Sequence, residues 1–288
     1  MGIDGLHPVL RPYLRSISLS EYTGKRVGCD ASAWLHRGAV ACAADLAQDN
    51  RWWIERGVHA PYVDFCLKML DMLRANGVKP VVVFDGGALP AKLATHQQRR
   101  ARRAEKLDKA RTMLTEGNTA AASSAFCATI DVTCEMAHEL MAALRRSGVD
   151  FVVAPYEADS QLAFLTQVPA GNGGIAAVIT EDSDLVTYGC PYVIFKADRS
   201  GHGQQLALAD LFGPPPSADQ NATPGEGSSS GGCNNGTGKP ASFRRFSLEM
   251  LQTVCVLAGC DFLPSVKGVG VKKALGLGHA PVQPGYMG

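Results

Sequence analysis

Two acidic stretches constrain the fold of this chain more than any other feature, because each follows an apolar run that is typical of a β-strand. The first, VAPYEADSQLAFL, carries Glu157 and Asp159, and the second, AAVITEDSDLVTYG, carries Asp182 and Asp184. In an open α/β sheet, the carboxyl ends of parallel strands line the ligand crevice. If the two strands are neighbours, four carboxylates share that crevice.

Carboxylates at such a density repel one another and resist ionisation. A divalent cation relieves this repulsion, and oxygen ligands at a sheet edge suit Mg²⁺ or Mn²⁺. The two stretches therefore predict a metal-dependent site for phosphoryl transfer.

Three further aspartates follow predicted elements elsewhere in the chain. Asp30 closes a short strand, KRVGCD, although on its own such an aspartate would most often be a helix N-cap. Asp85 follows the apolar run VVVF, which is typical of a parallel strand buried on both faces. Asp261 follows a helix predicted over residues 247–259. We expect Asp85 at the same sheet edge as the two acidic stretches.

A long basic segment, residues 92–117, follows Asp85 directly, and residues 118–148 are predicted to continue as helix. Between residues 97 and 111 the segment has seven basic residues against two acidic ones. Helical spacing gathers several of the basic residues on one face, which in an average protein is simply a solvated face. Here the position just after Asp85 favours contact with phosphates that enter the site.

The charge distribution fits such a substrate. The net charge is only +1, but residues 1–117 hold 18 Lys/Arg against 12 Asp/Glu, whereas the remainder holds 10 against 15. A basic half that faces an acidic site suits a polyanion that is bound through metal ions. The nine cysteines include no Cys-x-x-Cys pair, which argues against a zinc site or a disulfide framework. No apolar run approaches the ~18 residues of a membrane span, so we expect no transmembrane helix. The first residues, MGIDGL, lack the pattern of a signal peptide, so we expect an intracellular protein.

Six segments together resemble the 5′-nuclease superfamily, the relatives of flap endonucleases, and in particular its exonuclease 1 branch. They stand in the family's order and are MGIDGL, CDASAWLHRGA, VVVFDGGALPAK, VAPYEADSQLA, ITEDSDL and LAGCDFLPSVKGVG. The resemblance implies a PIN-like α/β fold: a mostly parallel central sheet flanked by helices, a helical arch over about residues 92–130, and a helix–two-turn–helix DNA-binding motif.

The resemblance also implies one nuclease domain in several parts. These are an N-terminal region that includes the start of the arch (1–117), an internal region (118–212) and the start of the helix–two-turn–helix region (243–288). Residues 213–242 are rich in Gly, Ser, Pro and Asn, and we expect them to form a disordered surface insertion between the last two parts. The resemblance extends to about Ala274, and because the family continues beyond the last residue of this chain, we expect a short form.

Site residues follow from the resemblance, position by position. Lys92 and Arg99 would act on the scissile phosphate at the foot of the arch. Gly268 and Gly270 would help to grip the duplex backbone with a potassium ion. The seven carboxylates that would hold two Mg²⁺ ions, directly or through water, are Asp30, Asp85, Glu157, Asp159, Asp182, Asp184 and Asp261. The other residues expected to contact DNA are Gly2, His36, Arg102, Arg103, Lys106 and Lys272.

By the same resemblance the chain would be a Mg²⁺-dependent 5′-to-3′ exonuclease on double-stranded DNA, with 5′-flap endonuclease activity. Its partners would be DNA with a 5′ end, nick or flap and the proteins of mismatch repair, and its location the nucleus. Ser32 stands where the branch usually has a tyrosine, so stacking on the DNA end would pass to His36 or Trp34.

Three other functions are compatible with parts of the sequence. A phosphatase of the haloacid dehalogenase type is suggested by the Asp-Ser-Asp triplet, but it would need an aspartate directly after the strand, where Thr180 stands. A flap endonuclease proper would share every motif. A truncated, non-catalytic DNA-binding module would keep the carboxylates but bind DNA without cleaving it.

Overall fold

The computed structural model describes residues 3–213, 243–244 and 246–278. The predicted insertion, except for its first residue, and Gly2 lie outside these ranges. Within the described part, no helix is both long enough and apolar enough to cross a membrane.

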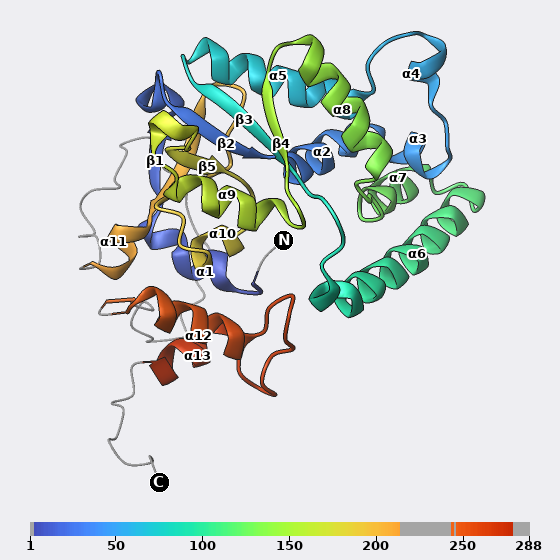
Figure 1. Cartoon of the computed structure of the whole chain (residues 1–288). Coiled ribbons are helices and arrows are strands. Elements are labelled where there is room, and N and C mark those ends of the chain that lie inside the picture. Colours follow the sequence, from blue (N-terminus) through green and yellow to red (C-terminus); the bar gives the residue numbers. More distant parts are fainter. Residues whose placement is uncertain (1–2, 214–242, 245, 279–288) are drawn as a thin grey trace, which may run out of the picture.

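A seven-stranded sheet crosses the molecule in the order β1-β7-β6-β5-β2-β3-β4 (Figure 1). The strands from β6 to β4 pair in parallel, whereas β7 is antiparallel to both of its neighbours. The predicted mostly parallel α/β sheet is therefore confirmed. The strands are β1 (Arg15–Ser18), β2 (Arg26–Asp30), β3 (Lys79–Phe84), β4 (Asp150–Val153), β5 (Ala177–Ile179), β6 (Tyr192–Phe195) and β7 (His202–Ala207).

The two acidic stretches do not follow neighbouring strands, so the arrangement considered from the sequence is wrong on this point. β2 and β3 lie between β5 and β4. The reason is burial: every residue of β3 after Lys79 is buried, as a central strand requires, whereas β4 is half-buried or exposed and occupies the edge. Because all four strands are parallel, their carboxyl ends still face one edge of the sheet.

The sheet separates two hydrophobic cores, as the alternation of side chains along β3 shows. Val82 and Phe84 face one core, whereas Val81 and Val83 face the other. The first core is covered by α2, α5, α7 and α8, and the second by α1, α9, α11, α12 and α13. In Figure 1, α5 and α8 lie above the sheet and α12 and α13 below it.

The helices vary widely in length, and most lie against one of the two cores. They are α1 (Leu6–Leu10), α2 (Ala31–Ala39), α3 (Ala43–Ala47), α4 (Trp52–Glu55), α5 (Pro61–Ala75), α6 (Leu93–Thr115), α7 (Thr119–Cys127), α8 (Cys134–Arg146), α9 (Ala158–Gln167), α10 (Asp184–Thr187), α11 (Leu208–Phe212), α12 (Leu248–Ala258) and α13 (Val271–Gly278).

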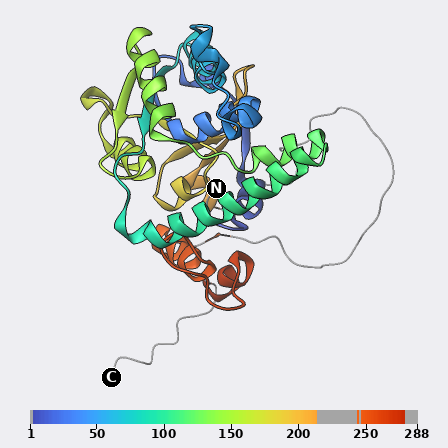
Figure 2. The same cartoon turned by 90° about the vertical axis from the view of Figure 1, so that its right-hand side faces the viewer.

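The basic segment forms one long helix, α6, whose only buried residue is Ala110. Figure 2 shows α6 extending along the outside of the body, and α7 packs against it. The predicted continuation of helix over residues 118–148 is interrupted. The chain leaves α7 after Cys127, and Thr133 caps α8 by accepting a hydrogen bond from the backbone N–H of Met136 at 3.4 Å.

Candidate active site

The candidate site begins where β2 and β3 end side by side. Asp30 is buried, and its Oδ1 accepts hydrogen bonds from the backbone N–H groups of Ser32 (2.9 Å) and Ala33 (3.2 Å), so it does cap α2. Asp85 accepts from the Ser32 hydroxyl at 2.5 Å and from the backbone N–H of Ala158 at 2.8 Å. The carboxylate of Asp85 thus connects the end of β3 to both α2 and α9.

Thr180, whose role no sequence motif indicated, connects the second acidic stretch to Asp30. Its buried hydroxyl donates to Asp30 Oδ2 at 3.2 Å and accepts from the backbone N–H of Asp182 at 3.0 Å. Asp182 Oδ1 in turn accepts from the backbone N–H of Asp184 at 2.9 Å. The only sequence signal was a threonine placed between an apolar strand and two aspartates.

Glycines at the end of β3 let the first acidic stretch approach closely. The backbone N–H of Gly86 donates to the carbonyl of Tyr156 at 2.6 Å, and that of Gly87 donates to the carbonyl of Pro155 at 3.0 Å. A Cβ at Gly86 would lie 1.9 Å from the carbonyl oxygen of Ala154, so only glycine fits there. This contact places Glu157, the N-cap residue of α9, beside the end of β3.

Two cations and two carboxylates meet where α6 begins. Lys92 is buried, and its Nζ lies 2.7 Å from Glu157 Oε1 and 3.5 Å from Asp261 Oδ2. Burial by itself would lower the pKa of Lys92, but the interactions with Glu157 and Asp261 raise it above its ordinary value. Arg99 also forms an ion pair with Asp261, and the hydroxyl of Thr95 donates to the Asp261 carbonyl at 2.8 Å. The start of α6 is thereby held against the turn that follows α12.

The described N-terminal residues also reach the site. The backbone N–H of Ile3 donates to Asp184 Oδ1 at 3.0 Å. This contact ties the N-terminal segment to the second acidic stretch, although Gly2 itself lies outside the described residues.

Asp159 shows most clearly that the carboxylates act on one another. Burial, followed by repulsion from Asp30, Asp182, Asp184 and Asp85, raises the pKa of Asp159 well above its ordinary value. Asp159, in the first turn of α9, is therefore close enough to the carboxylates at the ends of β2, β3 and β5 to be repelled by their charges.

The same two causes act on Asp30 and Asp184. Burial, together with the charge of Asp85, raises the pKa of Asp30 to about 6, against the opposing effect of its hydrogen bonds. Burial, together with the charges of Asp182 and Asp261, raises the pKa of Asp184 to about 7. All seven predicted carboxylates are thus joined by contact or by electrostatic interaction, including Asp261, which is distant in sequence.

The chemistry of this set fits a divalent metal, with one restriction. Among the described residues, no three Asp, Glu, His or Cys side chains converge tightly enough to hold one ion by themselves. Mg²⁺ usually keeps several waters and takes only one or two carboxylates directly, so a wider acidic pocket still suits it. Positive charge is also what the repulsion at Asp30, Asp159 and Asp184 requires.

The residues expected to contact DNA lie in different environments. His36 lies at the surface, but neighbouring atoms shield part of its ring from water, and this partial desolvation, together with the nearby charge of Arg103, lowers its pKa. Trp34 is only 1% exposed and belongs to the first core, so the alternative in which Trp34 stacks on the DNA end is wrong. Helical spacing turns Trp34 inward and His36 outward.

On α6, Arg102 and Lys106 are exposed, whereas Arg103 forms an ion pair with Asp131 at 2.5 Å. In the turn before α13, Gly268 has a φ of 78°, a left-handed conformation that favours glycine. Gly270 lies beside it, and Lys272 is exposed in the first turn of α13.

Comparison with known protein families gives two matches. The XPG N-terminal domain matches residues 1–106, and the XPG I-region matches residues 148–261. Together they include the ends of all the strands that carry the candidate carboxylates.

Curated relatives match along almost the whole chain. Exonuclease 1 of Xenopus laevis is 39% identical over 274 residues, which cover 95% of this chain and 32% of the relative. Exonuclease 1 of Arabidopsis thaliana is 37% identical over 275 residues, with 95% and 32% covered. Exodeoxyribonuclease 1 of Schizosaccharomyces pombe is 34% identical over 275 residues, with 96% and 42% covered. The chain thus spans about a third of the length of the first of these relatives.

Solved structures share the fold. The catalytic core of Rad2 in complex with a DNA substrate matches with a TM-score of 0.63 and 19% identity over 96% of this chain and 66% of that one. Flap endonuclease-1 from Methanococcus jannaschii matches with a TM-score of 0.54 and 18% identity over 96% and 76%.

Proposed function

Because the chain belongs to the XPG family of nucleases, we propose that it hydrolyses phosphodiester bonds of duplex DNA from a 5′ end, with the help of divalent metal ions. The observation that carries the proposal is the mutual interaction of the seven carboxylates around the ends of β2, β3 and β5, with Lys92 and Arg99 among them. The names of the relatives, which are exonucleases and exodeoxyribonucleases, support the substrate class.

Two Mg²⁺ or Mn²⁺ ions held by these carboxylates, partly through water, would supply an activated water and stabilise the leaving oxygen. The protein's own contribution is to bring the carboxylates together and to hold each of them in a fixed orientation by hydrogen bonds. Thr180 and Ser32 fix the carboxylates of Asp30 and Asp85, and the backbone of Ile3 fixes that of Asp184. No protein nucleophile is needed for this chemistry.

Lys92 and Arg99 would stabilise the charge that develops on the phosphoryl oxygens. Both lie at the start of α6, and both already contact the acidic side chains. A phosphate that enters the site would therefore meet two cations at the boundary of the carboxylate group. The cost of bringing the terminal nucleotide out of the duplex, a few kcal/mol, would be met by contacts with the rest of the DNA.

The remaining contacts would position DNA without selecting a sequence. Arg102, Arg103 and Lys106 of α6 would neutralise phosphates of the strand that passes the arch. His36 would contact the DNA end, as would Gly2. The turn with Gly268 and Gly270, assisted by a potassium ion and by Lys272, would bind the duplex backbone.

Action on nicks, gaps and flaps in the nucleus, in mismatch repair and recombination, is the cellular role that we propose by analogy with exonuclease 1 proteins. The second candidate function is cleavage of 5′ flaps in preference to recessed 5′ ends. We retain it because the chain shares its fold with flap endonuclease-1. A module that binds DNA without cleaving it is the third.

A cleavage assay separates these functions. The substrate is a duplex with a recessed 5′ end, labelled at the 3′ end of that strand, and it is compared with a 5′-flap substrate in Mg²⁺ and in chelator. We expect a ladder of shortened labelled strands with Mg²⁺ only, and none with Asp182→Ala, which should still bind DNA. Faster cleavage of the flap would favour the flap endonuclease, and binding without cleavage of either substrate would favour the DNA-binding module.

A further inference from the structure

An ion pair beside the second acidic stretch joins three separate parts of the chain. Arg37, in the last turn of α2, donates from Nη1 to Glu181 Oε1 at 2.9 Å and to the carbonyl of Ala197 at 3.4 Å. Glu181 stands between Thr180 and Asp182, in the turn that leads from β5 to α10, and Ala197 follows β6. The guanidinium of Arg37 therefore connects α2 to the chain after β5 and to the chain after β6.

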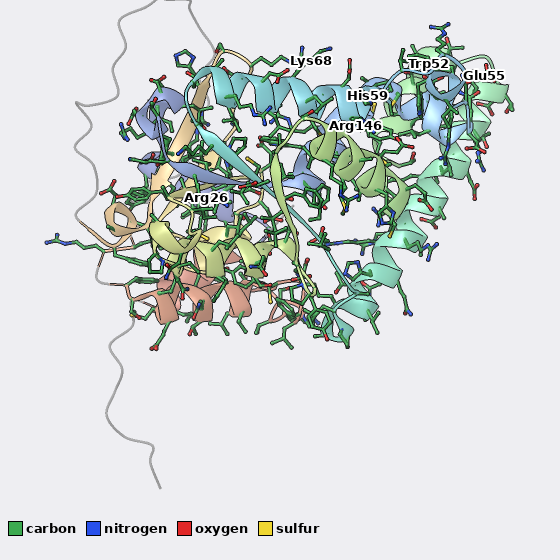
Figure 3. The ribbon with its side chains drawn as sticks, turned by 45° about the horizontal axis from the view of Figure 1, so that its top comes forward. Arg26, Trp52, Glu55, His59, Lys68 and Arg146 are labelled. Atoms are coloured by element: carbon green, nitrogen blue, oxygen red, sulfur yellow. The ribbon has the colours of Figure 1, made fainter. Side chains whose placement is uncertain are left out.

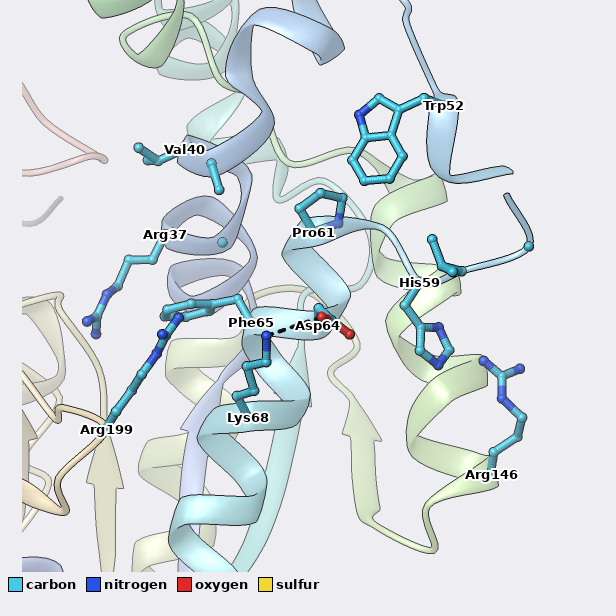
Figure 4. Close-up of a pocket in the computed structure, with 14 residues that line it drawn as sticks. Arg37, Val40, Trp52, His59, Pro61, Asp64, Phe65, Lys68, Arg146 and Arg199 are labelled. Carbon is cyan, nitrogen blue, oxygen red and sulfur yellow. Dashed lines mark hydrogen bonds and ion pairs between the residues drawn. The ribbon is translucent and has the colours of Figure 1, made fainter. Parts of the chain in front are cut away.

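Arg37 extends from a closely packed pair of helices. A Cβ at Gly38, the next residue, would lie 2.8 Å from Tyr62 Cα, so α2 and α5 are in close contact at this point. The guanidinium of Arg37 lies 5.5 Å from the ring centre of Phe65 in α5, and Figure 4 shows Arg37 near this ring. A guanidinium stacked on an aromatic ring still has N–H donors available in its own plane. Arg37 thus reaches Glu181 from a fixed base.

The backbone after β6 has an uncommon conformation next to the second acceptor of Arg37. Lys196 has a φ of 51°, in the left-handed region that residues with a side chain seldom adopt. The next residue, Ala197, is buried, and its carbonyl accepts from Arg37. Such conformations persist where surrounding contacts hold them, and they are common beside functional sites. The contact with Arg37 is one of the interactions that hold this turn.

The turn that carries Glu181 is subject to repulsion within the acidic site. The ionised carboxylate of Asp182 repels that of Asp30, which caps α2, and this repulsion acts to move the turn away from the start of α2. Thr180 opposes the movement through its hydrogen bonds to Asp30 and to the backbone of Asp182. The ion pair of Arg37 with Glu181 opposes the same movement, because Arg37 belongs to the helix that Asp30 caps.

We propose that Arg37 and Glu181 are a positioning pair for the metal site: their ion pair holds the turn after β5 where the carboxylate of Asp182 can share metal ions with Asp30. The side chains of Arg37 and Glu181 are 37% and 36% exposed, and ion pairs at such exposure contribute little to stability. The geometry that the pair imposes therefore explains it better than the stability that it adds. The inference rests on the proposed function, because it presupposes a metal site at the strand ends.

The affinity of the DNA-free protein for Mn²⁺, measured by electron paramagnetic resonance, separates positioning from simple electrostatics. Arg37→Gln removes a positive charge from beside an acidic site, so electrostatics alone would make Mn²⁺ bind more tightly, whereas loss of positioning makes it bind more weakly. We expect the affinity to fall about tenfold in both Arg37→Gln and Glu181→Gln, and no further in the double variant, because either change breaks the same pair. Arg37→Lys keeps the charge and should stay within about threefold of wild type.

The matched control is Arg26→Gln. Arg26 forms an ion pair with Asp150 at the same distance, 2.9 Å, and its side chain is similarly exposed, but this pair joins the starts of β2 and β4, at the edge of the sheet opposite the site. Figure 3 shows Arg26 in the left half of the molecule, away from α6 at the right. The control should keep its Mn²⁺ affinity within about twofold of wild type. In chelator, all variants should unfold within about 3 °C of wild type.

Steady-state cleavage of the recessed duplex gives a second readout. At a Mn²⁺ concentration that half-saturates the wild type, kcat of Arg37→Gln should fall about tenfold while KM for DNA changes by less than about twofold, and excess Mn²⁺ should restore much of kcat. A rise confined to KM would assign Arg37 to DNA contact and overturn the proposal.

Unchanged or tighter Mn²⁺ binding in Arg37→Gln, or equal weakening in Arg26→Gln, would also overturn the proposal, and the proposed function would stand. Failure of the wild type to bind Mn²⁺ would overturn the proposed function and the positioning pair together.

Discussion

At the scale of single residues, the candidate site is set by burial as much as by the number of carboxylates. Asp184 is 9% exposed, and its pKa is raised to about 7 because burial and neighbouring charges disfavour its ionised form. Lys92 is equally buried but keeps its charge because two carboxylates surround it. The sequence identified both residues through the family motifs, but neither their burial nor the role of Thr180 could be predicted, because both depend on side chains that are distant in the chain.

Asp184→Asn should stabilise the metal-free protein. At pH 8 it removes a charge that the fold disfavours, while an amide oxygen can still accept from the N–H of Ile3. We expect the free energy of unfolding to rise by roughly 1–3 kcal/mol at pH 8 in chelator, and the gain to fade by pH 5, where Asp184 is already protonated. Denaturant unfolding at the two pH values measures the effect, and cleavage should be lost. A destabilised variant at pH 8 would contradict the assigned burial.

Lys92→Ala should lower turnover far more than affinity. Its ammonium group is assigned to the transition state, so kcat should fall about 100-fold or more while KM changes by less than about threefold. Steady-state cleavage of the recessed substrate gives both constants. A loss confined to KM would assign Lys92 to DNA binding instead.

At the scale of elements, local sequence patterns predicted individual strands and helices better than they predicted which strands pair with one another. The apolar runs gave β2 and β3, and the periodicity of the basic segment gave α6 to within a few residues of its ends. The antiparallel strands β1 and β7 were not predicted, because their sequences alternate weakly and their pairing joins residues about 190 positions apart. The strand order was likewise unavailable from local sequence, which is why β4 and β5 were wrongly considered as neighbours.

The contact between the end of β3 and the first acidic stretch should be sensitive to one methyl group. Gly86→Ala would place its Cβ 1.9 Å from the Ala154 carbonyl, which must move, and we expect a loss of about 3 kcal/mol of stability together with impaired cleavage. Gly87→Ala is the matched control, because its Cβ would meet nothing closer than 3.4 Å. Thermal unfolding compares the two variants, and equal stability would contradict the close approach.

At the scale of the whole molecule, the fold collects negative charge from nearly its full length into one region. An aspartate in the unfolded chain has a pKa of about 3.9, whereas burial and repulsion raise the pKa of Asp30 to about 6 and that of Asp184 to about 7. At pH values between these limits the folded state holds protons that the unfolded state has released. Protonated Asp30 and Asp184 therefore contribute to the free energy of unfolding at low pH, and this contribution is lost as the pH rises through about 6 and about 7. His36, whose pKa is lowered, acts in the opposite direction below about pH 6.5.

Mg²⁺ should reverse this loss by binding to the ionised carboxylates. We expect a larger rise in the midpoint of thermal unfolding on adding Mg²⁺ at pH 8 than at pH 5.5, because at the lower pH protons occupy part of the site. Ca²⁺ and Na⁺ at equal ionic strength provide the controls for selectivity and screening. An equal Mg²⁺ effect at both pH values would mean that the ion binds elsewhere.

The most direct test of the central claim, that carboxylates remote in sequence form one metal site, is the number of Mn²⁺ ions bound at pH 8, counted by electron paramagnetic resonance. Asp30→Asn and Asp182→Asn change residues at the ends of different strands, and each keeps an oxygen that can accept the local hydrogen bonds. The account predicts two bound ions in wild type and the loss or marked weakening of binding in both variants. Unchanged Mn²⁺ binding in either variant would contradict it.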